Sequence, residues 1–446
     1  MSLFSFFAEM ALLTVSVFLS IVYAGIMLTY LWGWRALPEW QMPEGFVPKT
    51  KVSVIIPARN EAANIEACLR SILEGSYPHD LLEIIVVDDF SEDATTATVH
   101  LVQGQFSESL PPRIVLLRLS DFLPLEARFS ANKKKALEIG IAHATGELIV
   151  TTDADCVVPV DWLRLVVSRV APPQPPQGGE NLFAFSPCKI VAGPVSFSPD
   201  KSGSDALPPL GGLGGATLQR FQSLDFLGLM GITGAGIQLG FQRMGNGANL
   251  AYPKAVFEAV GGFSGNEDTA SGDDMFLVQK VAARWPGSVF FLKNAAATVL
   301  TEAPADWRSF LQQRLRWGTK NAALPEWPVR LVLLAVFLFC WSILTNSVLA
   351  ALAVVGVPAN NLSSVLAIVG ILANNLSLLP IILLFQLTVK AFFDYIFLRE
   401  MCRFFKREDL LRWFVPSFFL HILYVALVGI ASIFFRKYKW KGRQAK

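Results

Sequence analysis

The stretch that decides the fold class is Leu148-Ile149-Val150-Thr151-Thr152-Asp153-Ala154-Asp155. Its first half is apolar and β-branched, which predicts a buried strand, and two carboxylates on alternate residues follow where that strand ends. Magnesium and manganese prefer oxygen ligands, so such a pair can hold a divalent cation that also binds a diphosphate. By itself the pattern is weak evidence, because an acidic pair after a strand often only caps a turn.

Strand and helix patterns alternate around this stretch and predict an α/β domain with a mostly parallel sheet. Apolar runs at 52–56 and 83–87 predict two more buried strands, and helical spacing is found over 64–73 and 133–144. In such sheets the functional groups gather at the carboxyl ends of the strands. The two further strands also end in polar side chains, namely Arg59-Asn60-Glu61 and Asp88-Asp89.

Two acidic pairs allow both a chemical and a structural interpretation. Asp88 and Asp89 can accept hydrogen bonds from a nucleotide base or ribose, or one of them can cap the helix that follows. Asp273 and Asp274 precede a helical segment at 275–283, where a carboxylate can act as a general base toward an attacking hydroxyl. Helix capping is the equally plain alternative at that position.

A basic and aromatic cluster precedes a long uncharged block: Gln313-Arg314-Leu315-Arg316-Trp317. Arginine supplies donors for a departing diphosphate, and tryptophan supplies a flat face for a sugar ring. Anchoring at a membrane surface is the alternative, because Arg and Trp are common beside membrane spans.

The distribution of hydrophobic residues indicates a membrane protein. The 446 residues are 53% hydrophobic with a mean hydropathy of +0.45, and positions 10–34 and 331–389 contain no charged residue. We therefore expect an anchor at 1–34, a cytoplasmic domain at 50–325 and two spans within 331–389. The mixture of Phe with Lys and Arg over 390–412 predicts an amphipathic interfacial helix. Residues 413–435 predict a transmembrane or re-entrant helix, followed by a basic tail at 436–446, which four crossings would place on the outer side against the positive-inside rule.

Composition excludes several other classes of protein. The five cysteines form no CxxC pair and the four histidines are widely spaced, so a disulfide framework and a thiolate or histidine metal site are not expected. The net charge of +2 gives no reason to expect a nucleic-acid partner. Any chemistry is expected to depend on carboxylates.

Taken together and in order, these motifs resemble family 2 glycosyltransferases of the GT-A fold, an α/β, Rossmann-like nucleotide-diphospho-sugar transferase fold. The resemblance covers roughly residues 50–320 and is to the membrane-bound branch, which includes ceramide glucosyltransferase and the poly-N-acetylglucosamine, hyaluronan and cellulose synthases. Two departures stand out. The base motif, which is Thr-Glu-Asp in many synthases, is Gly272-Asp273-Asp274 here, and three lysines, Lys133-Lys134-Lys135, stand where one lysine precedes small residues.

The resemblance implies a role for each matching residue. Donor-binding roles fall on Pro57, Ala58, Arg59, Glu61, Asp88, Asp89, Lys133 and Asp153. Asp153 and Asp155 are the implied ligands of a divalent metal, Mn²⁺ or Mg²⁺. Catalytic roles fall on Asp274, favoured over Asp273 as the base, and on Gln313, Arg316 and Trp317.

The implied reaction is an inverting transfer from a UDP-sugar donor to an acceptor at the phospholipid bilayer of a bacterial cell, which can be a lipid or a glycan. About four spans are few for a polymer channel, which favours a single transfer to a lipid. A processive polysaccharide synthase is the alternative. A transporter or receptor with a nucleotide-binding domain would need intramembrane charges along a pathway, and 331–389 has none. A non-catalytic scaffold is disfavoured because every expected acid is present.

Overall fold

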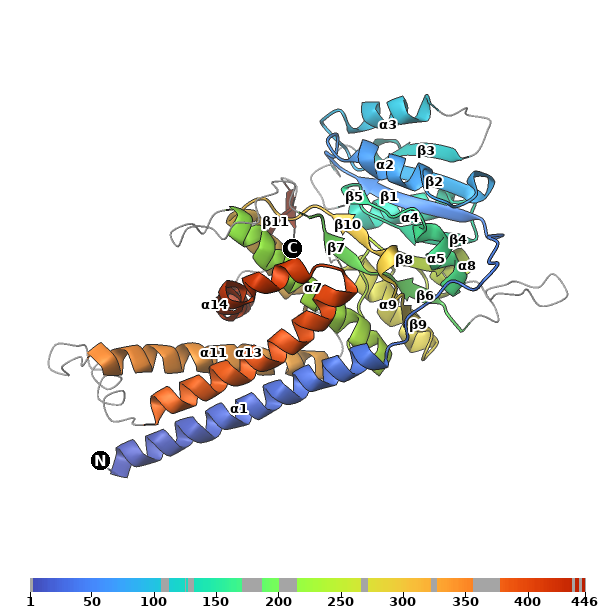
Figure 1. Cartoon of the computed structure of the whole chain (residues 1–446). Coiled ribbons are helices and arrows are strands. Elements are labelled where there is room, and N and C mark those ends of the chain that lie inside the picture. The colour runs from blue at the N-terminus through green and yellow to red at the C-terminus, as the bar shows by residue number, and fades with distance from the viewer. Residues whose placement is uncertain are drawn as a thin grey trace. The chain divides into compact units, whose positions relative to one another are not determined.

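The computed structural model describes residues 3–105, 112–124, 126, 132–170, 187–199, 215–265, 272–321, 327–355, 378–434, 438–440 and 443–445 (Figure 1). The chain divides into two compact units. The sheet unit comprises Gly33–Gln219, Leu229–Gln312 and Arg436–Lys446, and the helical unit comprises Met1–Trp32, Arg220–Gly228 and Gln313–Phe435. The Pro/Gly-rich stretch at 171–180, and all of 198–215 except its ends, lie outside the described residues.

The sheet unit is built on a seven-stranded mixed sheet with the order β3-β2-β1-β4-β8-β6-β9. The strands β3, β2, β1 and β4 are parallel to one another, whereas β8 is antiparallel to both β4 and β6. Their bounds are β1 (Val52–Ala58), β2 (Leu82–Asp88), β3 (Arg113–Arg118), β4 (Leu148–Thr151), β6 (Ile190–Ala192), β8 (Leu250–Pro253) and β9 (Val289–Phe291). A second sheet has the order β5-β10-β7, from β5 (Cys156–Val157), β7 (Val195–Phe197) and β10 (Val299–Thr301).

The predicted α/β architecture is therefore confirmed, with one difference in strand direction. The expected strands and helices at the start of the domain are present, and each begins and ends within a few residues of its predicted bounds. The main sheet is not wholly parallel, because β8 runs opposite to both of its neighbours, β4 and β6, while β6 and β9 pair in parallel. The carboxyl ends of β1, β2 and β4 still meet at one edge of the sheet, as the sequence predicted.

Helices pack on this sheet because its central strands are buried along almost their whole length. Every residue of β2 and β4 is buried, and in β1 only Pro57 is partly exposed. Close packing is possible where α4 meets β1, since a Cβ at Gly140 would lie 2.7 Å from the Ile55 side chain. The helices that contribute to this unit are α2 (Ile65–Leu73), α3 (Thr95–Gln103), α4 (Lys133–His143), α5 (Trp162–Val170), α8 (Lys254–Ala259), α9 (Asp273–Arg284), most of α7 (Gly215–Leu239) and the start of α10 (Trp307–Asn321).

Long apolar helices make up the helical unit. They are α1 (Leu3–Ala36), α11 (Trp327–Val355), α13 (Leu379–Phe404) and α14 (Phe414–Phe434), with the short η6 (Glu408–Trp413) before α14. Among the described residues, four segments are long and apolar enough to cross a membrane: Glu9–Ala36, Trp327–Ala353, Leu379–Phe404 and Glu408–Ser432. Helix α11 packs against both α13 and α14.

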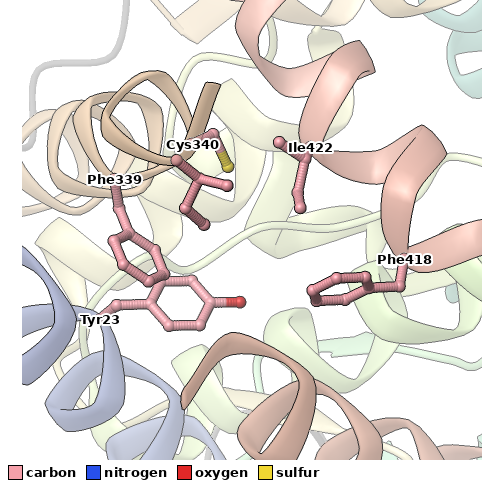
Figure 2. Close-up of a cluster of buried hydrophobic side chains, with 6 residues drawn as sticks. Tyr23, Phe339, Cys340, Phe418 and Ile422 are labelled. Atoms are coloured by element: carbon pink, nitrogen blue, oxygen red, sulfur yellow. The ribbon is translucent and has the colours of Figure 1, made fainter. Parts of the chain in front are cut away.

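An apolar cluster lies among these helices. Tyr23 of α1 stacks on Phe339 of α11 with ring centroids 4.6 Å apart. Figure 2 shows the Tyr23 hydroxyl pointing away from Phe339 and toward Phe418 of α14, with Cys340 and Ile422 beside the two rings. All of these side chains are buried. The buried members of the cluster come from three of the candidate spans, and Leu383, Leu387 and Ala391 of α13 pack against it.

The structure corrects the expected boundary at residue 390. Helix α13 continues unbroken from Leu379 to Phe404, so residues 390–404 belong to a candidate span and do not form a separate interfacial helix. The sequence prediction ended the span at its first charge, Lys390. That charge is tolerated inside the helical unit because it is fully buried and ion-paired with Asp394, one helical turn further on.

Candidate functional site

The loops after β1 and β2 are joined to each other at the carboxyl edge of the sheet. The Arg59 guanidinium donates to the carbonyl oxygens of Asp89 (2.6 Å) and Phe90 (3.0 Å), and the Asp89 amide donates to the carbonyl of Ala58 at 2.8 Å. Asn60 and Phe90 both have positive φ, 52° and 53°. These contacts give Arg59 a structural task, since it fixes the backbone beside the two acids.

Glu61 belongs to the same loop. Its amide donates to Thr95 Oγ1 at 2.8 Å and its carboxylate accepts from Asn64 at 2.9 Å. Pro57 stands opposite Val87 in the parallel pairing of β1 and β2. The predicted donor-binding residues of the first loop therefore lie directly beside those of the second.

Asp88 and Asp89 have different surroundings. Asp88 Oδ2 accepts from the Ser91 amide at 3.3 Å, so Asp88 caps the turn that follows β2. Burial raises the pKa of Asp88, and its hydrogen bonds from Ser91 only partly offset that effect. Asp89 accepts instead from the Asn132 amide at 3.2 Å, immediately before α4. Of the two acids, Asp88 therefore makes the capping contact, while the Asp89 carboxylate is held by the residue before α4.

The acids that follow β4 are partly exposed and face a lysine. Lys133 Nζ, at the start of α4, lies 2.5 Å from Asp153 Oδ1. Burial alone would lower the pKa of Lys133, but the ion pair with Asp153 and the nearby carboxylate of Asp274 outweigh it and raise the pKa from 10.5 to about 12. Asp155 is also partly exposed. A cationic group therefore already occupies one carboxylate of the pair, and the other is open to water.

Asp274 reaches the same place from α9. Gly272 precedes that helix with φ 99°, a conformation that favours glycine, and this turn starts the helix at the two acids. Asp274 Oδ2 accepts from the Gly247 amide at 3.0 Å. A Cβ at Gly247 would lie 3.8 Å from Asp274 Oδ2 and 3.9 Å from Lys133 Nζ. The base candidate Asp274, Lys133 and its partner Asp153 therefore converge beside the backbone of residue 247.

The structure distinguishes the members of the two ambiguous motifs. Asp273 is buried with its carboxylate 3.6 Å from Lys134, whereas Asp274 is partly exposed. Lys135 is half-exposed and pairs with Glu138 on the helix surface. Lys133 is thus the lysine that faces the Asp153 pair, and Asp274 is the more accessible of the two acids.

Gln313, Arg316 and Trp317 belong to the helical unit and are described within it. All three are partly exposed on α10. One face of the Trp317 ring is covered by the Arg314 guanidinium, 4.3 Å from the ring centroid, and Phe226 of α7 lies 6.1 Å away. That face is therefore not free for a sugar ring.

Three residues make contacts with these acids or motifs that could not be assigned from the sequence. Asn132 bonds Asp89, Lys134 faces Asp273, and Arg314 is a buried partner of Asp225 rather than a second surface arginine. The position of Asn132 directly before a predicted helix was the available signal for the first. Nothing in the local pattern distinguishes Arg314 from Arg316.

Comparison with known proteins identifies the class. Residues 53–175 match the model described as glycosyl transferase family 2, and residues 217–393 match that of glycosyl transferase family group 2. A mannosyltransferase from Pyrobaculum calidifontis, solved with GDP-Man and Mn²⁺, shares the fold with a TM-score of 0.50, over 94% of this chain and 99% of its own, at 18% identity. Two segments of the chain therefore match models of family 2 glycosyltransferases, and the chain has the GT-A fold.

Two relatives of known or probable activity are similar to this chain in sequence. The chain is 26% identical over 292 residues to a probable glycosyltransferase of Bacillus subtilis, and 27% identical over 290 residues to a beta-monoglucosyldiacylglycerol synthase of Synechocystis. Each match covers 64% of this chain, but only 58% and 51% of the respective relative. The chain thus spans little more than half the length of either relative.

Proposed function

We propose that this protein transfers one sugar from a UDP-sugar to the hydroxyl group of a membrane lipid, with inversion at the anomeric carbon, at a bacterial cell membrane. The observation that carries the proposal is the convergence of Lys133, Asp153 and Asp274 beside Gly247. A diphosphate needs cationic groups, and an attacking hydroxyl needs a base. This edge of the sheet offers both within one small region.

The carboxylates at this site fit a divalent cation whose coordination is completed by the substrate. Among the residues that the structure describes, no group of three or more His, Cys, Asp or Glu side chains is placed to hold a metal by itself. Mg²⁺ is commonly bound by one or two carboxylates together with phosphate oxygens and water, and Asp153 and Asp155 supply such a pair. When bound, the ion would offset the charge that builds up on the leaving diphosphate.

Three side chains would carry out the other steps of the reaction. Asp89 would accept hydrogen bonds from the nucleoside, and Lys133, which stays protonated, would hold a phosphate oxygen in place of its bond to Asp153. Asp274 would take the proton from the acceptor hydroxyl as that oxygen bonds to the anomeric carbon. The bond from that carbon to the diphosphate breaks, and UDP leaves with the electron pair.

A lipid acceptor is supported by the rest of the chain. In the part of the chain that the structure describes, four segments are long and apolar enough to cross a membrane, which would place the protein beside membrane lipids. The named activity of the Synechocystis relative is synthesis of a glucosyl diacylglycerol. Diacylglycerol and related hydroxyl lipids are therefore the first acceptors to test.

The test is a transfer assay with the full-length protein in lipid nanodiscs. Labelled UDP-glucose, UDP-galactose, UDP-N-acetylglucosamine and GDP-mannose are each incubated with Mn²⁺ and a bacterial lipid extract. We expect label from one UDP-sugar in a lipid that carries a single sugar, and none with Asp155→Asn. Label in a ladder of longer products would favour the processive alternative, label only from GDP-mannose would refute the uridine assignment, and no label in any lipid would refute lipid transfer.

A further inference from the structure

A buried ion pair fixes the second half of α10 inside the helical unit. Arg314 Nη2 lies 2.7 Å from Asp225 Oδ2 of α7, and both side chains are almost fully buried. The Arg314 guanidinium also lies 5.8 Å from the centroid of the Tyr424 ring on α14. Arg314 therefore contacts two other helices, α7 and α14, and the Trp317 ring on its own helix.

The polar contacts continue from this pair to the candidate spans. Asp225 Oδ1 lies 4.0 Å from Nε2 of His421 on α14, and Nδ1 of the same ring lies 3.3 Å from Lys390 Nζ on α13. Lys390 pairs with Asp394 at 2.6 Å, and the Tyr23 hydroxyl of α1 donates to Asp394. We call this set, Arg314, Asp225, His421, Lys390, Asp394 and Tyr23, the buried relay.

The charges of the buried relay balance. Two basic side chains face two carboxylates, so the set has no excess charge with which to attract an anionic ligand. Burying such groups is costly, and apolar residues of similar size often give a protein that is equally stable. Stability alone is therefore a poor reason for the relay to exist, whereas fixing one arrangement of the helices is a good one.

The buried relay includes a residue that lies within the Gln313–Trp317 motif of α10. Arg314 lies between Gln313 and Arg316 in sequence, and its guanidinium packs on the ring of Trp317. An arginine has a planar fork that can pair with a carboxylate while it stacks on an aromatic ring, which a lysine cannot do. The rotation and axial position of α10 are thereby tied to α7, α13 and α14.

We propose that the buried relay is a positioning device for the transfer reaction: it fixes α10 so that Gln313, Arg316 and Trp317 are presented in one register. Arg314, Asp225 and Lys390 are positioning residues and touch neither donor nor acceptor. The proposal rests on the proposed glycosyl transfer and on the catalytic roles that the family resemblance implies for those three residues of α10. A small misplacement of such groups lowers the rate of the chemical step far more than it weakens donor binding.

The test compares two ways of removing buried polar contacts from the same unit. Arg314→Leu/Asp225→Leu removes both charges at once, so neither is left buried without its partner. The matched control is Asn346→Leu, because Asn346 of α11 is fully buried and bonds only Ser16 and Gln386 among the contacts that the structure describes. Each variant is assayed for kcat, donor KM and thermal unfolding in nanodiscs.

We expect the double variant to unfold near the wild-type temperature and to lose about 10²-fold in kcat, with donor KM nearly unchanged. Asn346→Leu should keep its kcat whatever it loses in thermal stability. If the double variant retains wild-type kcat, or if the control loses kcat in parallel, the relay only holds the bundle together and the proposal is wrong. If the double variant cannot be recovered folded, Lys390→Leu/Asp394→Leu takes its place with the same expected result. A wild type that transfers no sugar would instead refute the proposed function.

Discussion

Two ion pairs of nearly equal length make different contributions to this protein. The Lys133–Asp153 pair of the sheet unit is 2.5 Å long, and about a third of each side chain is exposed. The Arg314–Asp225 pair of the helical unit is 2.7 Å long, and 1% and 6% of the two side chains are exposed. Water can replace either partner in the first pair, so a substrate can do so too. In the second pair, exchange would leave a buried charge without its partner.

The difference shows that access to water, rather than distance, separates a site that can bind a ligand from one that holds structure. An accessible pair contributes roughly 0–1 kcal/mol to folding and is readily exchanged. Breaking a buried pair by removing one partner costs about 3–5 kcal/mol, because the other charge stays in an apolar surrounding. The two units should therefore respond differently to the same kind of substitution.

The largest effect is expected at the accessible carboxylates. Asp155→Asn should abolish turnover while the protein stays folded, because Asp155 is partly exposed and the substitution keeps the size of the side chain. Exhaustive removal of divalent ions should have the same effect, and Mn²⁺ should restore the wild type alone. Asp161→Asn is the matched control, since Asp161 lies on the surface and bonds Ser76 at 2.6 Å. Full activity of the wild type in EDTA would contradict the metal assignment.

A smaller loss is expected at the base. Asp274→Asn keeps the size of the side chain and its acceptor for the Gly247 amide, but it removes the proton acceptor. The rate of transfer should fall about 10²–10⁴-fold with little change in donor binding. Asp273→Asn should retain most of the transfer rate, and its effect should be on stability through Lys134. The reverse pattern in kcat would move the base to Asp273.

Measurements of the free energy of unfolding test the difference between the accessible and the buried ion pairs. Lys133→Met should lower the free energy of unfolding by no more than about 1 kcal/mol. Lys390→Leu should lower it by about 3–5 kcal/mol, because Lys390 is fully buried and Asp394 would remain charged beside it. Lys390→Leu/Asp394→Leu should recover most of that loss. Equal losses for Lys133→Met and Lys390→Leu would show that access to water does not distinguish the pairs.

The sheet unit could be predicted from the sequence because its functional residues follow directly from strand ends. Asp88, Asp153 and their neighbours come after apolar runs that can only be buried strands, so their common edge follows from the topology. The antiparallel entry of β8 could not be predicted, because nothing local to residues 250–253 indicates strand direction. Individual hydrogen bonds within the motifs, such as that from Asn132 to Asp89, also could not be predicted, because they depend on how the side chains are oriented in the fold.

The buried relay could not be predicted for a different reason. Its members come from five helices, and their partners are distant in sequence, so no local pattern contains them. One signal was present. Lys390 and Asp394 are four residues apart, the spacing of an ion pair on one helical face, which is compatible with a continuing span. Treating the first charge as the end of the span concealed that signal.

The smallest predicted effect concerns the contact that the sequence analysis missed in the sheet unit. The Asn132 amide holds Asp89 from one side in a buried hydrogen bond of 3.2 Å. Asn132→Ala removes that bond from the carboxylate that is proposed to bind the nucleoside, and one such bond contributes about 0.5–1.5 kcal/mol, so donor KM should rise roughly 2- to 12-fold. Because Asp89 is proposed to bind the nucleoside and not the reacting atoms, kcat should stay the same. Gln103→Ala is the control, since it removes side-chain bonds to the Ile114 carbonyl at 3.0 Å and to the His100 ring at 2.8 Å, and involves none of the proposed donor-binding residues. A fall in kcat at unchanged KM in Asn132→Ala would place Asp89 at the chemical step rather than at the nucleoside.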